Sequence, residues 1–265
     1  MVPHRLAGGK DASKVGLNAR EMLSKSLKQY LLVGVEPEFD AANPSAAVKA
    51  LAGAEGVVSV SAFLSDAIRS HADVVLPMAT FPESYGTYVN ATGNWQTAKG
   101  ASMAPGDARP VWKIMRVLAD AQELAGFSYE SPEALTKEAQ QQCTSIELNN
   151  LTDIKSVTYS AHMNDALVRA GETPIYATDP LVRRSQPLQK SADGKQAYAS
   201  MSADEMSKLG VADGDMVKVK QGGGTAELAA RTDDGVPAGC VWVPAGLPQT
   251  QHLGDVFDAI EVHKA

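Results

Sequence analysis

The first part of the chain alternates short apolar runs with amphipathic stretches. Apolar residues fill positions 30–35 almost without interruption, and shorter runs span 57–60 and 73–77. Continuous runs of this kind are typical of parallel strands buried on both faces. Helical spacing of apolar residues covers 18–28 and 44–53. Strands that alternate with helices predict a parallel sheet with right-handed crossovers.

Several polar residues stand where helices are expected to begin. Asn43 and Ser65 precede helical segments and can accept hydrogen bonds from the first turn, the second helix ending near residue 71. We expect Pro110 to be the first residue of the clearest amphipathic helix, whose apolar stripe contains Val111, Ile114, Met115 and Leu118. We expect this helix to cover the sheet. A further helix is expected over residues 131–142.

Residues 80–108 form a long polar stretch, rich in glycine and proline, that predicts a loop. Its side chains offer hydrogen-bond donors and acceptors for a ligand or another subunit, and plain solvent-exposed surface is the alternative. The candidate site residues are Glu83, Tyr85, Asn90, Asn94, Trp95 and Gln96.

The last third of the chain changes to short strands and tight turns. We expect an α/β domain over residues 1–144, a linker over 145–177 and a β-rich domain over 178–265. Ser202 and Glu205 form a capping-box pattern for a short helix that ends at Gly210. The glycines at 222–224 predict a hairpin turn, because no helix follows them as a phosphate-binding loop would require.

Charge and hydropathy exclude two partner classes. The chain has 24 Lys and Arg against 31 Asp and Glu, and its basic residues do not cluster beyond Arg183 and Arg184, so no nucleic-acid partner is expected. Its longest apolar runs fall far short of the roughly 20 residues that a membrane span needs. Residues 1–10 lack the apolar core of a signal peptide, so we expect the cytoplasm, where the two N-x-T matches at 90–92 and 150–152 carry no glycan.

No metal site or nucleophile is visible in the sequence. Cys143 and Cys240 belong to no CxxC motif, and the 5 histidines are dispersed, so this chain alone holds no iron–sulfur cluster or zinc. Asp66, His71 and Asp73 are close in sequence, but a helix end beside a strand start explains them as well as catalysis does. From the residues alone, we predict an α/β plus β protein without its own active site.

Three passages together resemble the molybdopterin oxidoreductase family. The first contains ADVVLP at 72–77 and E-x-x-G-T-x-x-N at 83–90, the second is GDARPVWKI at 106–114, and the third lies within 203–241. Their order and spacing fit over most of residues 30–245. Within the family, residues 31–40 and 175–185 look most like the large iron–sulfur subunit of NADH:quinone oxidoreductase, respiratory complex I.

This resemblance implies a Rossmann-like parallel-sheet domain followed by a smaller β-barrel domain of the double-psi type. It also implies iron–sulfur clusters in upstream domains that this chain lacks, so the chain looks like a fragment or a split product. Thr92 and Asn94 replace an acid and an arginine of the family signature, which disfavours a retained pterin contact. The polar loop then becomes a vestigial pocket or a contact loop. We expect Tyr85, Tyr88 and Trp95 to fold over the carboxyl ends of the strands, and mobile side chains are the alternative.

Three hypotheses follow for the function. The leading one is a structural region of a complex I subunit, without a cofactor of its own, in contact with other subunits of the peripheral arm and associated with the membrane only through that complex. The second is a fragment of a molybdenum or tungsten enzyme, such as a formate dehydrogenase or nitrate reductase, that helps to bind a pterin. The third is a β-barrel binding module fused to an α/β domain.

Overall fold

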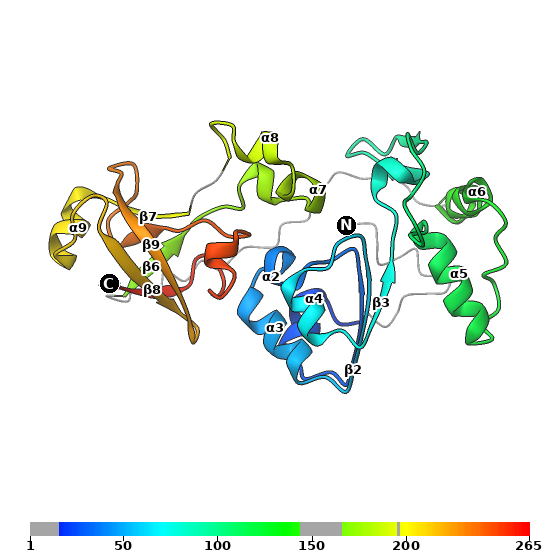
Figure 1. Cartoon of the computed structure of the whole chain (residues 1–265), viewed down its shortest axis with the longest axis horizontal. Coiled ribbons are helices and arrows are strands. Elements are labelled where there is room, and N and C mark those ends of the chain that lie inside the picture. Colours follow the sequence, from blue (N-terminus) through cyan, green and yellow to red (C-terminus); the bar gives the residue numbers. More distant parts are fainter. Residues whose placement is uncertain (1–15, 144–165, 195–196) are drawn as a thin grey trace.

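A computed structural model describes residues 16–143, 166–194 and 197–265. Figure 1 shows an α/β unit in the middle, a helical unit with a small hairpin on one side, and a β-barrel on the other. The expectations for residues 1–10, for the N-x-T match at 150–152 and for most of the linker lie outside the described residues.

The α/β unit follows the predicted alternation. Its elements are α1 (Ala19–Ser24), β1 (Gln29–Val33), α2 (Pro37–Asp40), α3 (Pro44–Ala52), β2 (Gly56–Ser61), α4 (Asp66–His71) and β3 (Val74–Pro77). The strands form a parallel sheet in the order β1-β2-β3, in which Leu31 pairs with Val58 and Val58 with Val74. The prediction of a parallel sheet is therefore confirmed.

Local capping chemistry sets the helix starts, as expected. The Asn43 side chain accepts from the Ala46 N–H, and the Ser65 hydroxyl accepts from the Ile68 N–H. The first helix is shorter than predicted, because the chain turns to an extended conformation at Lys25. There the Tyr30 hydroxyl donates to the carbonyl oxygen of Lys25, which satisfies a group that a longer helix would bond internally.

The sheet is not buried on both faces, contrary to the prediction. On one face Tyr30 packs with Leu51 and Val57 in a small core, and Figure 1 shows α2, α3 and α4 grouped together beside the sheet. On the other face Leu31 is 50% exposed and Val33 39%. The continuous apolar run correctly indicates a parallel strand, but its second face has no layer of helices in the described part of the chain.

The next unit contains structure where a loop was expected. Its elements are η2 (Phe81–Glu83), β4 (Gly86–Val89), β5 (Trp95–Ala98), α5 (Val111–Ala121) and α6 (Pro132–Cys143). The strands β4 and β5 form an antiparallel hairpin, with Tyr88 opposite Gln96. The helices are close to the predicted segments, but Pro110 is the N-cap of α5 and not its first residue.

The last unit is a closed barrel with short helices around it. Its elements are β6 (Leu167–Ala170), η3 (Ile175–Ala177), α7 (Pro180–Arg183), α8 (Gln186–Gln189), β7 (Tyr198–Met201), α9 (Ala203–Leu209), β8 (Met216–Gln221), β9 (Gly224–Thr232), β10 (Cys240–Trp242), η4 (Pro248–Thr250) and β11 (Ala259–Lys264). The barrel closes in the order β10-β6-β11-β8-β9-β7. Its core contains Val217, Val219, Val241 and Leu253, all fully buried.

Strand β6 corrects the prediction for the linker. It lies within residues 145–177, yet it pairs with β10 and β11 and completes the barrel. The sequence signal is weak because this short strand carries the fully buried Arg169, which removes the apolar pattern. The other boundaries of the predicted domains, 1–144 and 178–265, stay predictions.

The predicted turns and caps of the barrel are largely correct. The Ser202 hydroxyl accepts from the Glu205 N–H, and Gly210 has a φ of 66° at the end of α9. The Glu205 carboxylate does not complete a capping box, since it accepts from Lys208 Nζ at 3.1 Å instead. The hairpin between β8 and β9 turns at Gly222 and Gly223, both with positive φ.

Candidate functional site

The polar residues predicted as a site mostly build their own hairpin. The Glu83 carboxylate accepts from the Thr80 N–H at 2.9 Å and so caps η2. Asn90 Oδ1 accepts from the main-chain N–H of Asn94 at 2.9 Å, inside the turn between β4 and β5. Trp95 and Gln96 lie on β5, all of whose residues are exposed. The six residues therefore share one loop and hairpin, and none of them lines the two cavities described below.

The prediction that aromatic residues fold over the carboxyl ends of the strands is wrong for Tyr88 and Trp95, and it stays a prediction for Tyr85, which is partly buried. Tyr88 is 55% exposed and Trp95 36%. The hairpin pairing places both side chains on a small two-stranded sheet of their own. Other residues occupy the carboxyl end of the parallel sheet, and those that follow β1 include the charged Glu36, Glu38 and Asp40.

A cluster of ion pairs lies at the carboxyl end of β1. Glu36 follows this strand and is 1% exposed. Its Oε2 accepts from Arg183 Nη1 at 2.7 Å, and its Oε1 accepts from Arg184 Nη2 at 2.5 Å. Arg183 also bonds the Asp40 carboxylate. The cluster joins α2 of the α/β unit to α7, which precedes the barrel strands β7–β11.

Two aromatic rings lie against these arginines. The guanidinium carbon of Arg183 is 5.1 Å from the ring centre of Phe39, and that of Arg184 is 4.1 Å from the ring centre of Phe63. Phe63 follows β2 and Glu36 follows β1. Arg184 therefore contacts the segments that leave two neighbouring parallel strands, which is the edge where such sheets bind ligands.

A cavity of about 340 Å³ lies beside the cluster. Its lining includes Phe39, Tyr176, Arg183, Arg184, Gly246 and Leu247. The cavity is formed jointly by α2, by the segment around α7 and by the loop after β10. It is a junction between the two halves of the chain.

A second buried carboxylate adds negative charge at the same edge. Glu38 is 3% exposed, and its Oε1 accepts from the Ala67 N–H at 2.9 Å. Its Oε2 has no hydrogen-bond partner within the described ranges. Burying a carboxylate without full pairing is costly, and a further anion nearby would raise that cost.

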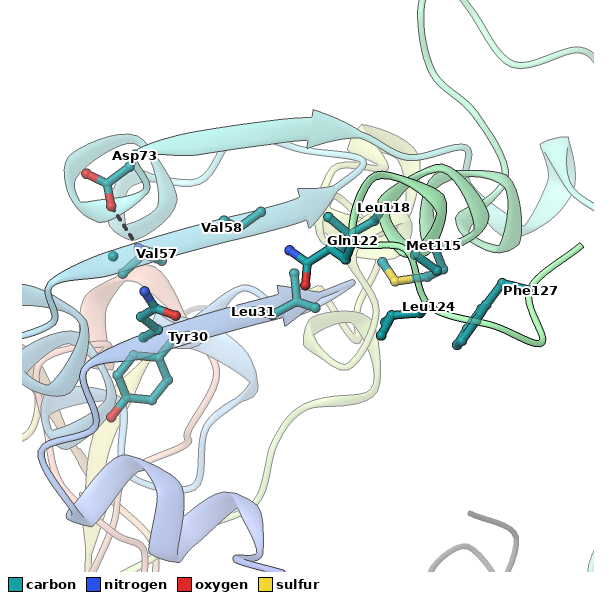
Figure 2. A pocket seen from close by; sticks show the side chains of 13 residues that line it. Tyr30, Leu31, Val57, Val58, Asp73, Met115, Leu118, Gln122, Leu124 and Phe127 are labelled. Carbon is teal, nitrogen blue, oxygen red and sulfur yellow. Dashed lines mark hydrogen bonds between the residues drawn. The ribbon is translucent and has the colours of Figure 1, made fainter. Parts of the chain in front are cut away.

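The open face of the sheet forms a second cavity, of about 640 Å³. Figure 2 shows Leu31 and Val58 on the sheet side of the opening, with Met115 and Leu118 of α5 and then Phe127 on the other side. The helix α5 was expected to cover the sheet, but it leaves this gap instead. The lining is mostly apolar, as in a surface that packs against polypeptide.

The position of this second cavity disfavours a cofactor site. It extends to the amino ends of the strands, at Gln29, Gly56 and Asp73, whereas ligands of α/β sheets bind at the carboxyl ends. Asp73 has a structural role there, because its Oδ2 accepts from the Val57 N–H at 2.8 Å (Figure 2). We therefore regard this apolar surface as a candidate interaction surface and call it the open face.

The described residues offer little for metal chemistry. No three His, Cys, Asp or Glu side chains among them are grouped as metal ligands. Cys143 and Cys240 are free and partly buried. Among the helices that the structure describes, none is long and apolar enough to cross a membrane.

Comparison with known proteins now identifies the family. The model of molybdopterin oxidoreductases matches residues 5–121, and the model of the molybdopterin dinucleotide binding domain matches residues 181–262. The chain belongs to the molybdopterin oxidoreductase family. The acetylene hydratase of Pelobacter acetylenicus has a similar fold, with a TM-score of 0.67 over 93% of this chain and 46% of that chain, at 14% identity.

Sequence relatives within the molybdopterin oxidoreductase family have different functions. An NADH-quinone oxidoreductase subunit of Streptomyces coelicolor is 29% identical over 92% of this chain and 28% of its own length. The 78 kDa subunit of NADH-ubiquinone oxidoreductase of Candida albicans is 33% identical over 44% of this chain and 15% of its own. The F420-dependent formate dehydrogenase 2 subunit alpha of Methanococcus maripaludis is 36% identical over 40% and 16%. The chain therefore spans less than a third of the length of these relatives.

The name of the second family model implies a pterin dinucleotide, and the residues at the carboxyl end of the sheet do not fit one. The phosphates of a dinucleotide need free cations or N–H donors. Here Glu36 and Asp40 pair with Arg183 and Arg184, and Glu38 adds a carboxylate. The sequence shows Arg183 and Arg184 as a basic pair, but it does not predict that Arg183 contacts Glu36 across 147 positions.

Proposed function

We propose that this chain is a non-catalytic, structural region of a complex I subunit of the large iron–sulfur type. One observation carries this proposal. Similarity to the NADH-quinone oxidoreductase subunit of Streptomyces coelicolor extends over 92% of the chain, and so includes both the α/β part and the barrel, whereas similarity to the formate dehydrogenase subunit covers 40%. The ion pairs at the carboxyl end of the sheet support the proposal that this chain binds no pterin.

In this proposal the chain holds no cofactor, and the iron–sulfur clusters belong to upstream domains of the full subunit. Its partners are other subunits of the peripheral arm, and it associates with the membrane only through the complex, from the cytoplasmic side. The open face suits such contacts, because a parallel sheet is stable when both its faces are covered. We further propose that the closed barrel is of the double-psi type, because the sequence motifs in this part of the chain resemble a family whose last domain is such a barrel.

The test is purification of the tagged protein from the detergent-solubilised membranes of its native cells. We expect it to migrate with NADH:quinone oxidoreductase activity and with other subunits of that enzyme. Metal analysis of the same sample should find iron from the clusters of the complex, and molybdenum and tungsten at far below one atom per chain. Stoichiometric molybdenum or tungsten, with formate or nitrate oxidoreductase activity, would contradict the proposal and favour the second hypothesis.

A further inference from the structure

We propose that Glu36, Asp40, Arg183 and Arg184 form an ionic clamp that fastens the segment before the barrel to the carboxyl end of the sheet and excludes phosphate-bearing ligands from that edge. This inference deepens the proposed function and rests on it, because it takes from it that the chain holds no cofactor. The inference names the residues that occupy the edge of the sheet where a ligand would bind.

The charges of the clamp balance within the chain. Two carboxylates meet two guanidinium groups, and Glu36 uses both oxygens, with Arg183 at 2.7 Å and Arg184 at 2.5 Å. A guanidinium binds a carboxylate and a phosphate with the same planar donors. Glu36 therefore occupies the donors that a ligand's phosphate would need.

Burial makes the pairing obligatory. The side chains of Glu36 and Arg183 are 1% and 9% exposed, and that of Arg184 is 35% exposed. Removal of one partner from a buried pair leaves an uncompensated charge, which costs far more than the loss of an exposed pair. Neutralising Glu36 should therefore open the local structure on both sides of the junction.

A separate polar contact between the two halves makes the effect of the clamp measurable. Asp255, which lies between β10 and β11, accepts from Asn43 Nδ2 at 2.8 Å and from Arg20 Nη2 at 2.7 Å. These bonds do not involve the clamp. A variant that lacks the clamp can keep this contact and a folded barrel, so that the change is confined to the junction.

The experiment is hydrogen exchange with mass spectrometry on the full chain, comparing the native protein with Glu36→Gln, Arg184→Gln and the double variant. In Glu36→Gln, peptides covering residues 36–41 and 177–190 should exchange about tenfold to a hundredfold faster, and peptides of β8 and β9 should be unchanged. The double variant should exchange more slowly than the product of the two single effects predicts, because the groups share one interaction. Glu55→Gln is the matched control, since Glu55 pairs with Lys28 on the exposed surface at 2.8 Å.

Additive effects of the two substitutions, or equal effects of Glu36→Gln and Glu55→Gln, would overturn the clamp. If Glu36→Gln fails to fold, Arg184→Gln and Asp40→Asn provide the same comparison at the partly exposed side of the cluster.

A titration tests the exclusion of ligands. Calorimetry of the native chain with inorganic pyrophosphate and with GDP should show no saturable binding at millimolar concentration. Saturable binding that Arg183→Gln abolishes would overturn the exclusion. Neither measurement depends on the subunits that co-purify with the protein, so failure of the clamp and failure of the proposed function are distinguishable.

Discussion

Arg169 donates a hydrogen bond from Nε to the main-chain oxygen of Val243, at 3.0 Å, inside the barrel. Its Nη atoms donate to the main-chain oxygens of Pro244 at 2.9 Å and Gly254 at 2.8 Å, and to Gln221 Oε1 at 3.2 Å. The side chain is 1% exposed. Burial lowers the pKa of Arg169 to about 10, partly opposed by the charge of Asp255. At neutral pH the guanidinium is therefore still charged, and it connects β6 to the loops after β10.

Replacing this arginine should destabilise the barrel strongly. Arg169→Met keeps a long side chain but leaves four buried acceptors without their donor, so we expect a loss of about 3 kcal/mol or more in the free energy of unfolding. Urea denaturation followed by circular dichroism measures the loss. Arg231→Met, at an exposed position on β9, is the control. It removes only a guanidinium that lies 5.6 Å from the ring centre of Tyr198, so it should change stability by about 1 kcal/mol or less. Equal effects of the two substitutions would show that the buried bonds contribute nothing.

Features set by neighbouring residues could be predicted from the sequence. The parallel strands, the caps at Asn43, Ser65 and Ser202, and the left-handed end of α9 at Gly210 each depend on chemistry within a few positions. Strand β6 could not be predicted, because its inward residue is Arg169 and no apolar alternation marks it. Its place in the barrel depends on partners more than 70 positions away, such as Val243.

The candidate site on the polar loop stays a prediction, but two of its side chains already have partners within the loop. A long polar stretch indicates function only if its side chains remain available, and here Glu83 and Asn90 bond to their own turns. The clamp could not be recognised in the same way. Glu36 and Arg183 are far apart in the sequence, and neither belongs to a motif that marks a functional site. Only the fold brings them together.

Removing the cap of α9 should have a modest cost. Ser202→Ala deletes the oxygen that accepts from the Glu205 N–H at 3.3 Å, so we expect a loss of about 1 kcal/mol in unfolding free energy. Ser202→Gly, which permits the same backbone, should lose only a few tenths. Denaturant melts of the three proteins measure this order, and coincident melts would argue against the cap.

Truncating Trp95 should have a small effect on the stability of the chain. Trp95 lies on β5, is 36% exposed, and does not fill a cavity at the carboxyl ends of the strands. We expect Trp95→Ala to change the unfolding free energy by about 1 kcal/mol or less, whereas Leu51→Ala, at a residue 3% exposed, should cost about 2–5 kcal/mol. A comparable loss for both would mean that Trp95 is packed as core. Its fluorescence maximum should lie near that of a partly hydrated indole.

The last strand of the barrel carries a pH-dependent contact. The hydrogen bond from Lys264 Nζ, at 2.6 Å, and then that from the Ala212 N–H hold the pKa of Asp215 below its ordinary value of 3.8. Since the folded pKa is lower than the unfolded one, the contribution to stability is present above pH 3.8 and is lost as the pH falls through the lowered value. Carboxyl titration by NMR should show this depression, and Lys264→Met should move the pKa of Asp215 toward 3.8. Lys208→Met, which removes the partner of Glu205, should leave it unchanged.

A polar substitution on the open face should weaken association with other subunits without destabilising the free chain. Leu31 is 50% exposed in the free chain, so Leu31→Gln should change its unfolding free energy by about 0.5 kcal/mol or less. In the assembled complex the same position should be covered, and the polar group would then be buried without a partner, at a cost of about 1–3 kcal/mol. Co-purification from native membranes should therefore fall about tenfold for Leu31→Gln. Leu64→Gln is the matched control, because Leu64 is 45% exposed and does not line the cavity between β1 and α5. Equal co-purification of the two variants would show that partners bind elsewhere, whereas a loss of stability in the free Leu31→Gln chain would show that this face is already packed.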